Sequence, residues 1–307
     1  MRQVFLVIAL IVLCTLITVG QPRFLTVYNV LNVLEQAAVI GIVSAGVVML
    51  MIGGGFDLSV GSGVVLGAYI VAIAFKNELP PHLAIFLALL GGAALGVVNG
   101  VGIAHLGIPS LIMTLGTLYA VRGGVLYLSG GETIGYRFPD AFTFIGKGDL
   151  AELPMPVIIV AVVYIIFFVI TKKTRFGLYT VAVGTDSDTA WRAGISAKQH
   201  LTTLYIISGT LAALAGIVLT ARIDAATVRF GDGYELQCIA AVVIGGTSLF
   251  GGRGTLPGTV LGVLFLAIVH NGINLLGVSP FLATFAIGAL LLFSATIDIA
   301  ATLTRRT

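Results

Sequence analysis

The stretch MLMIGGGFDLSVGSGVVLGAYI at residues 49–70 places a glycine-rich segment and the carboxylate of Asp57 between two apolar runs. In a lipid bilayer every backbone N–H and C=O group needs a hydrogen-bond partner, so a helix breaks only where protein or water supplies one. We therefore expect this segment to interrupt a membrane helix and to face the protein interior or the aqueous boundary.

The composition around this stretch is that of a membrane protein. The 307 residues are 58% hydrophobic and 9% charged, whereas soluble domains carry about 25% charged residues. Several apolar runs approach the roughly 20 residues needed to cross a hydrocarbon core. The net charge of +3 is small and scattered, which argues against nucleic acid as a partner.

Ten apolar runs predict an all-α polytopic membrane protein with about ten transmembrane helices, some broken or re-entrant. The first run exceeds the apolar core of a signal peptide and lacks a small-residue cleavage site, so we interpret it as a retained span. No soluble domain separates the runs, and residues 1–307 are expected to form a single integral membrane domain. The runs cover about residues 4–20, 37–52, 59–75, 83–104, 109–128, 155–171, 201–221, 236–250, 257–277 and 281–300.

Basic residues orient these spans, because Lys and Arg concentrate in cytoplasmic loops. The connection 172–200 holds five Lys or Arg residues and is the densest basic loop. Arg2 lies at the N-terminus, and Arg305 and Arg306 lie near the C-terminus. Ten spans with both termini in the cytoplasm place all three basic regions on the same side. We expect a multi-pass membrane protein with its N- and C-termini in the cytoplasm.

Two similar segments within the chain indicate a possible inverted repeat. The segments NGVGIAHLGIPSL (99–111) and NGINLLGVSPF (271–281) both combine Asn-Gly, a glycine turn and a proline between two spans. Under the predicted topology the two hairpins cross the bilayer in opposite directions. This arrangement would relate spans two to five to spans seven to ten.

No pattern in the chain predicts catalysis, a metal site or a cofactor. The glycine-rich segment GGRGTLPGT (251–259) lacks the lysine of a phosphate-binding loop. The four histidines are isolated from one another, and no nucleophile–base pair is recognisable. Cys14 and Cys238 lie in apolar runs, so we interpret them as packing residues without a disulfide.

Two glycine-rich breaks are candidates for a gate or hinge. In the first, Asp57 or Ser59 can cap the following helix. The second lies in VVIGGTSLFGGRGTLPGTVLG (242–262), on the same side of the membrane. Helix-end chemistry alone also accounts for both breaks, and the two interpretations are compatible. The candidate residues are Gly54, Gly55, Asp57, Ser59, Gly61, Gly245, Gly246, Gly251 and Gly252.

Polar residues within the spans or at their edges are candidates for a solute path, because polar groups are costly in lipid. Hydrogen bonding between helices is the alternative explanation for each of them. The candidates are Asn32, Gln36, Asn99, Thr114, Asn271 and Asn274.

The segment GTDSDTAWRAGIS (184–196) predicts a short helix in the basic loop. Asp186, Ser187 or Asp188 can cap its start, and Gly194 can end it. Such a helix can dock a soluble partner or lie on lipid headgroups. The residues of interest are Gly184, Asp186, Asp188, Trp191, Arg192, Gly194 and Ile195.

Several motifs resemble those of the permease subunits of bacterial ABC sugar importers, the ribose/xylose/arabinose/galactose permease family. They are GGGFDLSVGS (53–62), TRFGLYTVAVGTDSDTAWRAGIS (174–196), GYELQCIAAVVIGGTSLFGGRGTLPGT (233–259) and NGINLLGVSPF (271–281). The similarity runs in order over nearly the whole chain. Phe56 stands where the family has Ile, and Asp186 and Trp191 stand where it commonly has Asn and Ala.

The resemblance implies a non-enzymatic subunit that translocates a monosaccharide across the bacterial inner membrane. It would pair with a second permease subunit and work with a cytoplasmic ATP-binding subunit and a periplasmic sugar-binding protein. Residues 184–195 would form the ATPase-coupling loop. Three alternatives remain: an ABC permease for an amino acid, nucleoside or autoinducer-type sugar derivative; an ion-coupled secondary transporter; and a receptor or scaffold.

Overall fold

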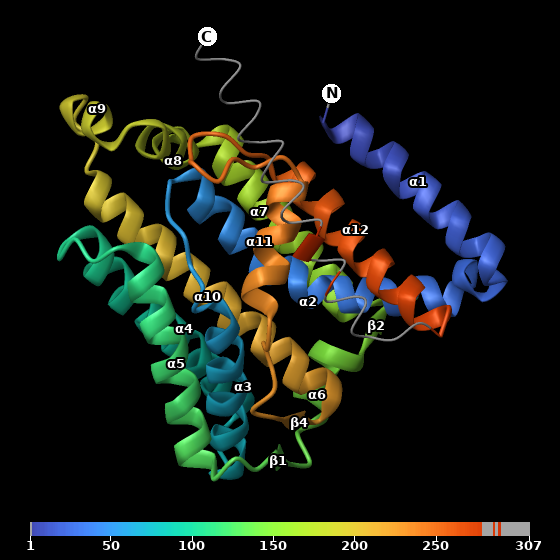
Figure 1. The fold of residues 1–307 in the computed structure, drawn as a ribbon. Helices are drawn as coiled ribbons and strands as arrows, with labels where there is room; N and C mark the ends of the chain where they lie inside the picture. The colour runs from blue at the N-terminus through green and yellow to red at the C-terminus, as the bar shows by residue number, and fades with distance from the viewer. Residues whose placement is uncertain (1, 278–284, 286–287, 290–307) are drawn as a thin grey trace.

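A computed structural model describes residues 2–277, 285 and 288–289, and the chain in it is built from helices with four two-residue strands (Figure 1). The prediction of an all-α polytopic membrane protein is confirmed. The helices are α1 (Arg2–Gly20), η1 (Pro22–Leu25), α2 (Val27–Ile52), α3 (Val60–Lys76), α4 (Pro81–Ala104), α5 (Ser110–Ser129), α6 (Asp140–Lys147), α7 (Met155–Lys173), α8 (Arg175–Thr185), α9 (Ser187–Arg192), α10 (Ala197–Ile223), α11 (Tyr234–Ile244) and α12 (Leu256–Leu275). The strands are β1 (Ile134–Gly135), β2 (Asp149–Leu150), β3 (Leu153–Pro154) and β4 (Ala225–Ala226), paired antiparallel as β1–β4 and β2–β3.

The first nine predicted spans each correspond to a helix of the structure, but the lengths of some of these helices differ from the prediction. Within the described residues, seven helices are long and apolar enough to cross a membrane: α1, α2, α4, α5, α7, α10 and α12. Helices α3 and α11 are apolar but shorter. The tenth predicted span, 281–300, lies largely outside the described residues.

Two predicted boundaries are wrong. The span predicted at 236–250 ends at Ile244, because Gly245 and Gly246 stop helix α11. The span predicted at 37–52 begins ten residues earlier, at Val27, where Thr26 caps α2 by accepting a hydrogen bond from the Asn29 backbone N–H.

Helices α2 and α10 form the centre of the bundle. Of the most apolar stretch of each, 78% is buried, against 17% for α1, α5 and α7. The two run antiparallel: Glu35 of α2 pairs with Arg222 near the end of α10 at 2.9 Å, and Gly53 after α2 lies against Leu204 nearer the start of α10. A Cβ atom on Gly46 would lie 2.9 Å from Cα of Ser208, so the close approach of the helices needs this glycine.

The order of elements is the same in two parts of the chain. A long buried helix, an irregular segment, a shorter helix and a second long helix occur as α2–α4 and again as α10–α12. The irregular segments are residues 53–59, here called the first break, and residues 224–233. Because α2 and α10 run antiparallel, this order supports the predicted inverted repeat.

The two ends of the bundle differ (Figure 1). Helices α8 and α9 lie at one end, called the α9 end. Strands β1 and β4 lie at the other end, where Phe75, Phe138 and Phe142 stack with centroids 4.7–5.4 Å apart. Lys147 pairs with Asp224 there.

The cysteines are free, as predicted: Cys14 is half-buried and Cys238 is buried.

Candidate functional site

A cleft of about 1020 Å³ opens at the α9 end of the bundle. Its walls come from the first break, the corner between α8 and α9, the end of α4 and the start of α10. Phe250 adds a contribution from residues 245–255, here called the second break. The cleft therefore brings together the two glycine breaks and the predicted coupling loop at residues 184–195, three segments that lie at least 50 residues apart in the sequence.

Direct backbone contacts join the coupling loop to both breaks at Gly184. A Cβ atom on Gly184 would overlap the carbonyl oxygen of Ile52, at the end of α2, and would lie 2.9 Å from the backbone nitrogen of Gly252. A Cβ atom on Gly251 would lie 2.5 Å from the Gly184 carbonyl oxygen. The Gly252 N–H also donates to the Ile52 carbonyl, at 2.8 Å. We call these contacts the glycine junction.

Helix α9 has the ends predicted from the sequence. The Asp186 carboxylate accepts hydrogen bonds from the backbone N–H groups of Asp188 and Thr189, at 3.0 and 3.1 Å, and from the Thr189 hydroxyl, at 2.7 Å. Gly194 takes a positive φ of 83°, and the Ile195 N–H reaches back to the Ala190 carbonyl at 3.0 Å. Of the predicted caps, Asp186 is thus the one used, and Gly194 ends the helix.

The outer face of α9 is exposed. Trp191 is 71% exposed, and Asp188 and Arg192 are also exposed. The hydroxyl of Thr189 holds the pKa of the Asp186 carboxyl below its usual range, with help from the neighbouring backbone N–H groups and from the charge of Arg192. The carboxylate therefore stays ionised and keeps its capping hydrogen bonds at neutral pH.

Helix α8 is also fixed to α10. The Thr180 hydroxyl and Nε2 of His200 lie 2.9 Å apart, and the rings of Phe176 and His200 are 4.5 Å apart. Both contacts lie close to the glycine junction. The end of α8 that leads into α9 therefore contacts α2, α10 and the second break.

A buried hydrogen-bond network holds the first break, and Asp57 is at its centre. Asp57 is 2% exposed. Its Oδ1 accepts from the backbone N–H of Ser59 at 2.8 Å and from the Ser59 hydroxyl at 2.6 Å, and its Oδ2 accepts from the Ser208 hydroxyl at 3.0 Å. Asn99 donates to the Ser59 hydroxyl at 2.7 Å and accepts from Thr117 at 2.8 Å. The network thus ties the first break to α4, α5 and α10.

Of the two capping candidates in the first break, Asp57 makes the bonds. Ser59 occupies the cap position of α3, but its own side chain makes no capping hydrogen bond. A further clamp was missed in the sequence: the Tyr205 hydroxyl donates to the Phe56 carbonyl at 3.0 Å and accepts from its N–H at 3.3 Å. The signal available in the sequence was the polar hydroxyl of Tyr205 within an apolar helix.

The remaining glycines serve close packing. A Cβ atom on Gly245 would overlap the Gly258 carbonyl oxygen of α12, and Gly246 has a φ of 94°. Gly61 lies against Glu235, at the start of α11. Gly54 lies next to Gly184, and Gly55 packs on Leu50. Gly54, Gly251 and Gly252 therefore belong to the glycine junction, whereas the other glycines pack helices elsewhere.

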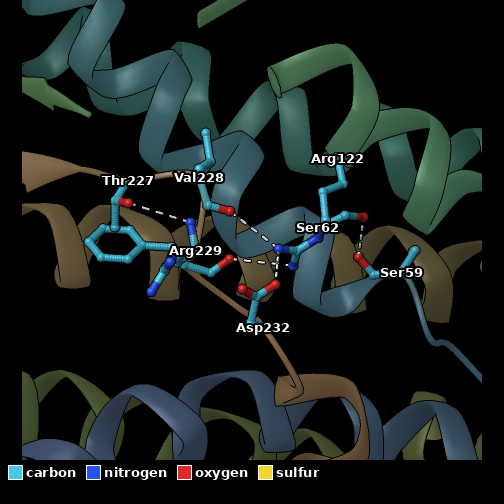
Figure 2. A network of polar contacts seen from close by, with 8 residues as sticks. Ser59, Ser62, Arg122, Thr227, Val228, Arg229 and Asp232 are labelled. Atoms are coloured by element: carbon cyan, nitrogen blue, oxygen red, sulfur yellow. Dashed lines mark hydrogen bonds and ion pairs between the residues drawn. The ribbon is translucent and has the colours of Figure 1, made fainter. Parts of the chain in front are cut away.

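The segment 227–233, here called the outer loop, is anchored through Arg122 of α5 (Figure 2). The Arg122 guanidinium pairs with Asp232 and donates to the Val228 carbonyl at 3.2 Å. Figure 2 also shows Ser62, at the start of α3, donating to the Ser59 carbonyl. A Cβ atom on Gly61 would lie 2.6 Å from the Gly231 carbonyl oxygen. The outer loop therefore reaches the start of α3.

The structure does not bring the six solute-path candidates together. Asn99 belongs to the Asp57 network, and the Thr114 hydroxyl donates to the Ser110 carbonyl in its own helix. Asn271 exchanges two hydrogen bonds with Asn29, at 2.9 and 3.0 Å, which ties α12 to α2.

The side chains of the other three candidates make no hydrogen bond within the described part of the chain. Asn32 is half-buried, and Asn274 and Gln36 are exposed. Gln36 lines a second, smaller pocket, together with Arg222, Tyr234, Gln237 and His270. Arg222, Tyr234 and His270 had no distinguishing sequence signal, because each lies near the end of a span.

Comparison with known proteins gives one family. The family described as "Branched-chain amino acid transport system / permease component" matches residues 29–295. The chain is 37% identical over 292 residues to the ribose import permease protein RbsC of Bacillus subtilis (strain 168), covering 95% of this chain and 91% of that protein.

Two relatives from Escherichia coli (strain K12) are similar at lower identity. The D-allose transport system permease protein AlsC is 34% identical over 90% of this chain and 84% of its own length. The galactose/methyl galactoside import permease protein MglC is 32% identical over 95% and 92%. No solved structure matches the chain significantly. The resemblance to sugar permeases is confirmed.

Proposed function

Because the chain belongs to the family described as the permease component of the branched-chain amino acid transport system, we propose that it is the permease subunit of an ABC importer for a monosaccharide. The names of its relatives, which specify ribose, allose and galactose, support a sugar rather than an amino acid as cargo. The energy comes from a separate cytoplasmic ATP-binding subunit. A periplasmic sugar-binding protein delivers the sugar, and a second permease subunit completes the path.

The distribution of charge supports a cytoplasmic location for the α9 end. Among the described residues, the loops and terminal helical turns of this end carry seven Lys or Arg and two Asp, whereas those of the opposite end carry six Lys or Arg and eight Asp or Glu. An excess of basic residues marks the cytoplasmic side. The basic residues of the α9 end are Arg2, Lys172, Lys173, Arg175, Arg192, Lys198 and Arg253.

In this proposal the glycine junction transmits the movement of α9 to the rest of the permease. Its partners at Gly184 are backbone groups of Ile52 and Gly252, so α9 has little freedom to move alone. When the ATP-binding subunit displaces α9, the ends of α2 and of the second break follow. This movement opens the path between the two permease subunits toward the cytoplasm, while the Asp57 network keeps the first break folded.

The test is transport by the reconstituted complex. The chain is placed in proteoliposomes with its ATP-binding subunit and binding protein, and uptake of labelled D-ribose, D-allose, D-galactose and L-leucine is measured together with ATPase activity. We expect ATP-dependent uptake of at least one sugar. Uptake without ATP would indicate a secondary transporter, and uptake of leucine alone would indicate an amino acid importer.

Coupling is tested at α9. Gly194→Pro and Arg192→Glu are expected to leave membrane insertion intact and to abolish sugar-dependent stimulation of the ATPase. Lys173→Glu, a charge reversal on an exposed residue at the same end, is the matched control and should transport normally. Normal transport by both α9 variants would show that α9 is not the docking element.

A further inference from the structure

The smaller pocket lies in the half of the bundle away from α9, between α2, α10, α11 and α12. Its volume is about 220 Å³, which has room for one sugar ring. Gln36 lies about 14 Å along α2 from its start, and His270 lies about 8 Å before the end of α12, at a rise of about 1.5 Å per residue. Both are therefore at a depth where exposed polar side chains are costly in lipid.

The polar side chains of this pocket have unused hydrogen-bonding capacity. Within the described ranges, Gln36, Tyr234, Gln237 and His270 form no side-chain hydrogen bond. In the same two helices, α2 and α12, Asn29 and Asn271 instead satisfy each other by exchanging two hydrogen bonds. Unpaired groups gathered around one cavity indicate that a polar molecule completes their bonding.

The chemistry of the wall favours an uncharged ligand. Glutamine side chains both donate and accept, as hydroxyl groups do. The one cation, Arg222, is already paired with Glu35 at 2.9 Å, so the wall has no net charge to offer an anion. The apolar floor includes Ile40 and Leu266, against which the C–H face of a sugar ring can pack.

We propose that this pocket is a binding site of the permease itself for an uncharged, polyhydroxylated ring, occupied by the sugar on its way through the outer half of the membrane. Gln36 and Gln237 contact its hydroxyl groups. The inference rests on the proposed import of a monosaccharide, and it assigns to the permease a selective contact in addition to that of a binding protein.

Cysteine protection tests occupancy directly. In a Cys14→Ser, Cys238→Ala background, Gln237→Cys is reacted with a methanethiosulfonate reagent in proteoliposomes of the assembled transporter. We expect the sugar that the wild-type complex imports to slow the reaction at least threefold. Asn274→Cys, on an exposed position of α12 outside the pocket, is the control and should react at the same rate with or without sugar.

Transport gives the second measurement. Gln36→Leu and Gln237→Leu each remove hydrogen bonds to the sugar and should slow uptake about fivefold, with unchanged unfolding temperature and basal ATPase activity. Asn77→Leu, at an exposed position outside the pocket, is the control and should transport normally. If the wild-type complex imports a sugar but neither protection nor slower uptake is seen, the pocket is not a sugar site. If the wild-type complex imports none of the sugars, the proposed function itself is wrong.

Discussion

The first break and the outer loop occupy matching places in the chain, yet they are held in different ways. The first break depends on Asp57, which is 2% exposed and accepts hydrogen bonds from two serines. The outer loop depends on an ion pair between Arg122 and Asp232, whose side chains are 17% and 59% exposed.

The difference shows how access to water decides the chemistry of an anchor. Among the described residues no cation pairs with Asp57, so hydroxyl and backbone donors satisfy its oxygens. At Asp232 water remains available, and a salt bridge to Arg122 is enough to hold the segment. We therefore expect the first break to be the more stable anchor and the outer loop to be the more sensitive to salt.

The largest effect is expected from Asp57→Ala. The substitution leaves the donors of Ser59 and Ser208 without an acceptor in a dry interior, which should reduce the free energy of unfolding by about 3 kcal/mol. Unfolding of the purified protein in detergent measures the change. Asp57→Asn keeps one acceptor and should cost less. An alanine variant as stable as wild type would contradict the importance of this network.

A smaller loss is expected from Gly184→Ala, which disturbs the glycine junction beside the first break. The added methyl group would overlap the Ile52 carbonyl, and such overpacking costs about 2 kcal/mol. The same unfolding measurement applies, with Gly123→Ala as the matched control. No heavy atom lies within 4 Å of a Cβ at Gly123, so this change should be neutral or stabilising. Equal effects at both positions would contradict the junction.

The outer loop should respond less and should depend on ionic strength. Arg122→Gln breaks a partly exposed ion pair and is expected to cost about 1 kcal/mol at low salt. Because salt screens this interaction, the difference from wild type should shrink in 1 M NaCl, where the Debye length is about 3 Å. Asp57→Ala, in contrast, should keep its full effect in salt. A salt-independent loss for Arg122→Gln would remove the distinction between the two anchors.

Asp186 extends the comparison between buried and exposed anchors. Its carboxylate caps a helix as that of Asp57 does, but it is exposed to water. The Thr189 hydroxyl holds the pKa of Asp186 below its usual range, so the stabilisation of α9 is present at neutral pH and is lost as the pH falls through that lowered value. Asp186→Asn should therefore differ from wild type at pH 7 and converge with it in acid. Hydrogen exchange at the Thr189 amide measures this, and a difference that persists at low pH would contradict it.

Local signals in the sequence were sufficient for the class of fold and for α9. Apolar runs located the helices, and an aspartate and a glycine six to eight residues apart gave both ends of α9. Hydropathy failed at the start of α2, because Asn32, Glu35 and Gln36 interrupt the run. Glu35 is accommodated by Arg222, a residue 187 positions away that hydropathy does not connect to it.

The site was predictable only in part for the same reason. The sequence identified the glycines and the coupling loop separately, but it could not show that Gly184 touches Ile52 and Gly252. The six path candidates were chosen as polar residues in spans, and their partners decide their roles. Asn271 has Asn29 as a partner, whereas Gln36 has none among the described residues.

The glycine junction also has an evolutionary consequence. Its contacts are made by main-chain atoms of Gly184, Ile52 and Gly252 and involve no side chain of α9, so motion can pass through Gly184 whatever side chains α9 presents to its surroundings. Trp191 and Arg192 can then be exchanged to suit a different energising protein while the linkage beneath them is retained. The outer face of α9 can therefore vary while the backbone contacts beneath it stay the same.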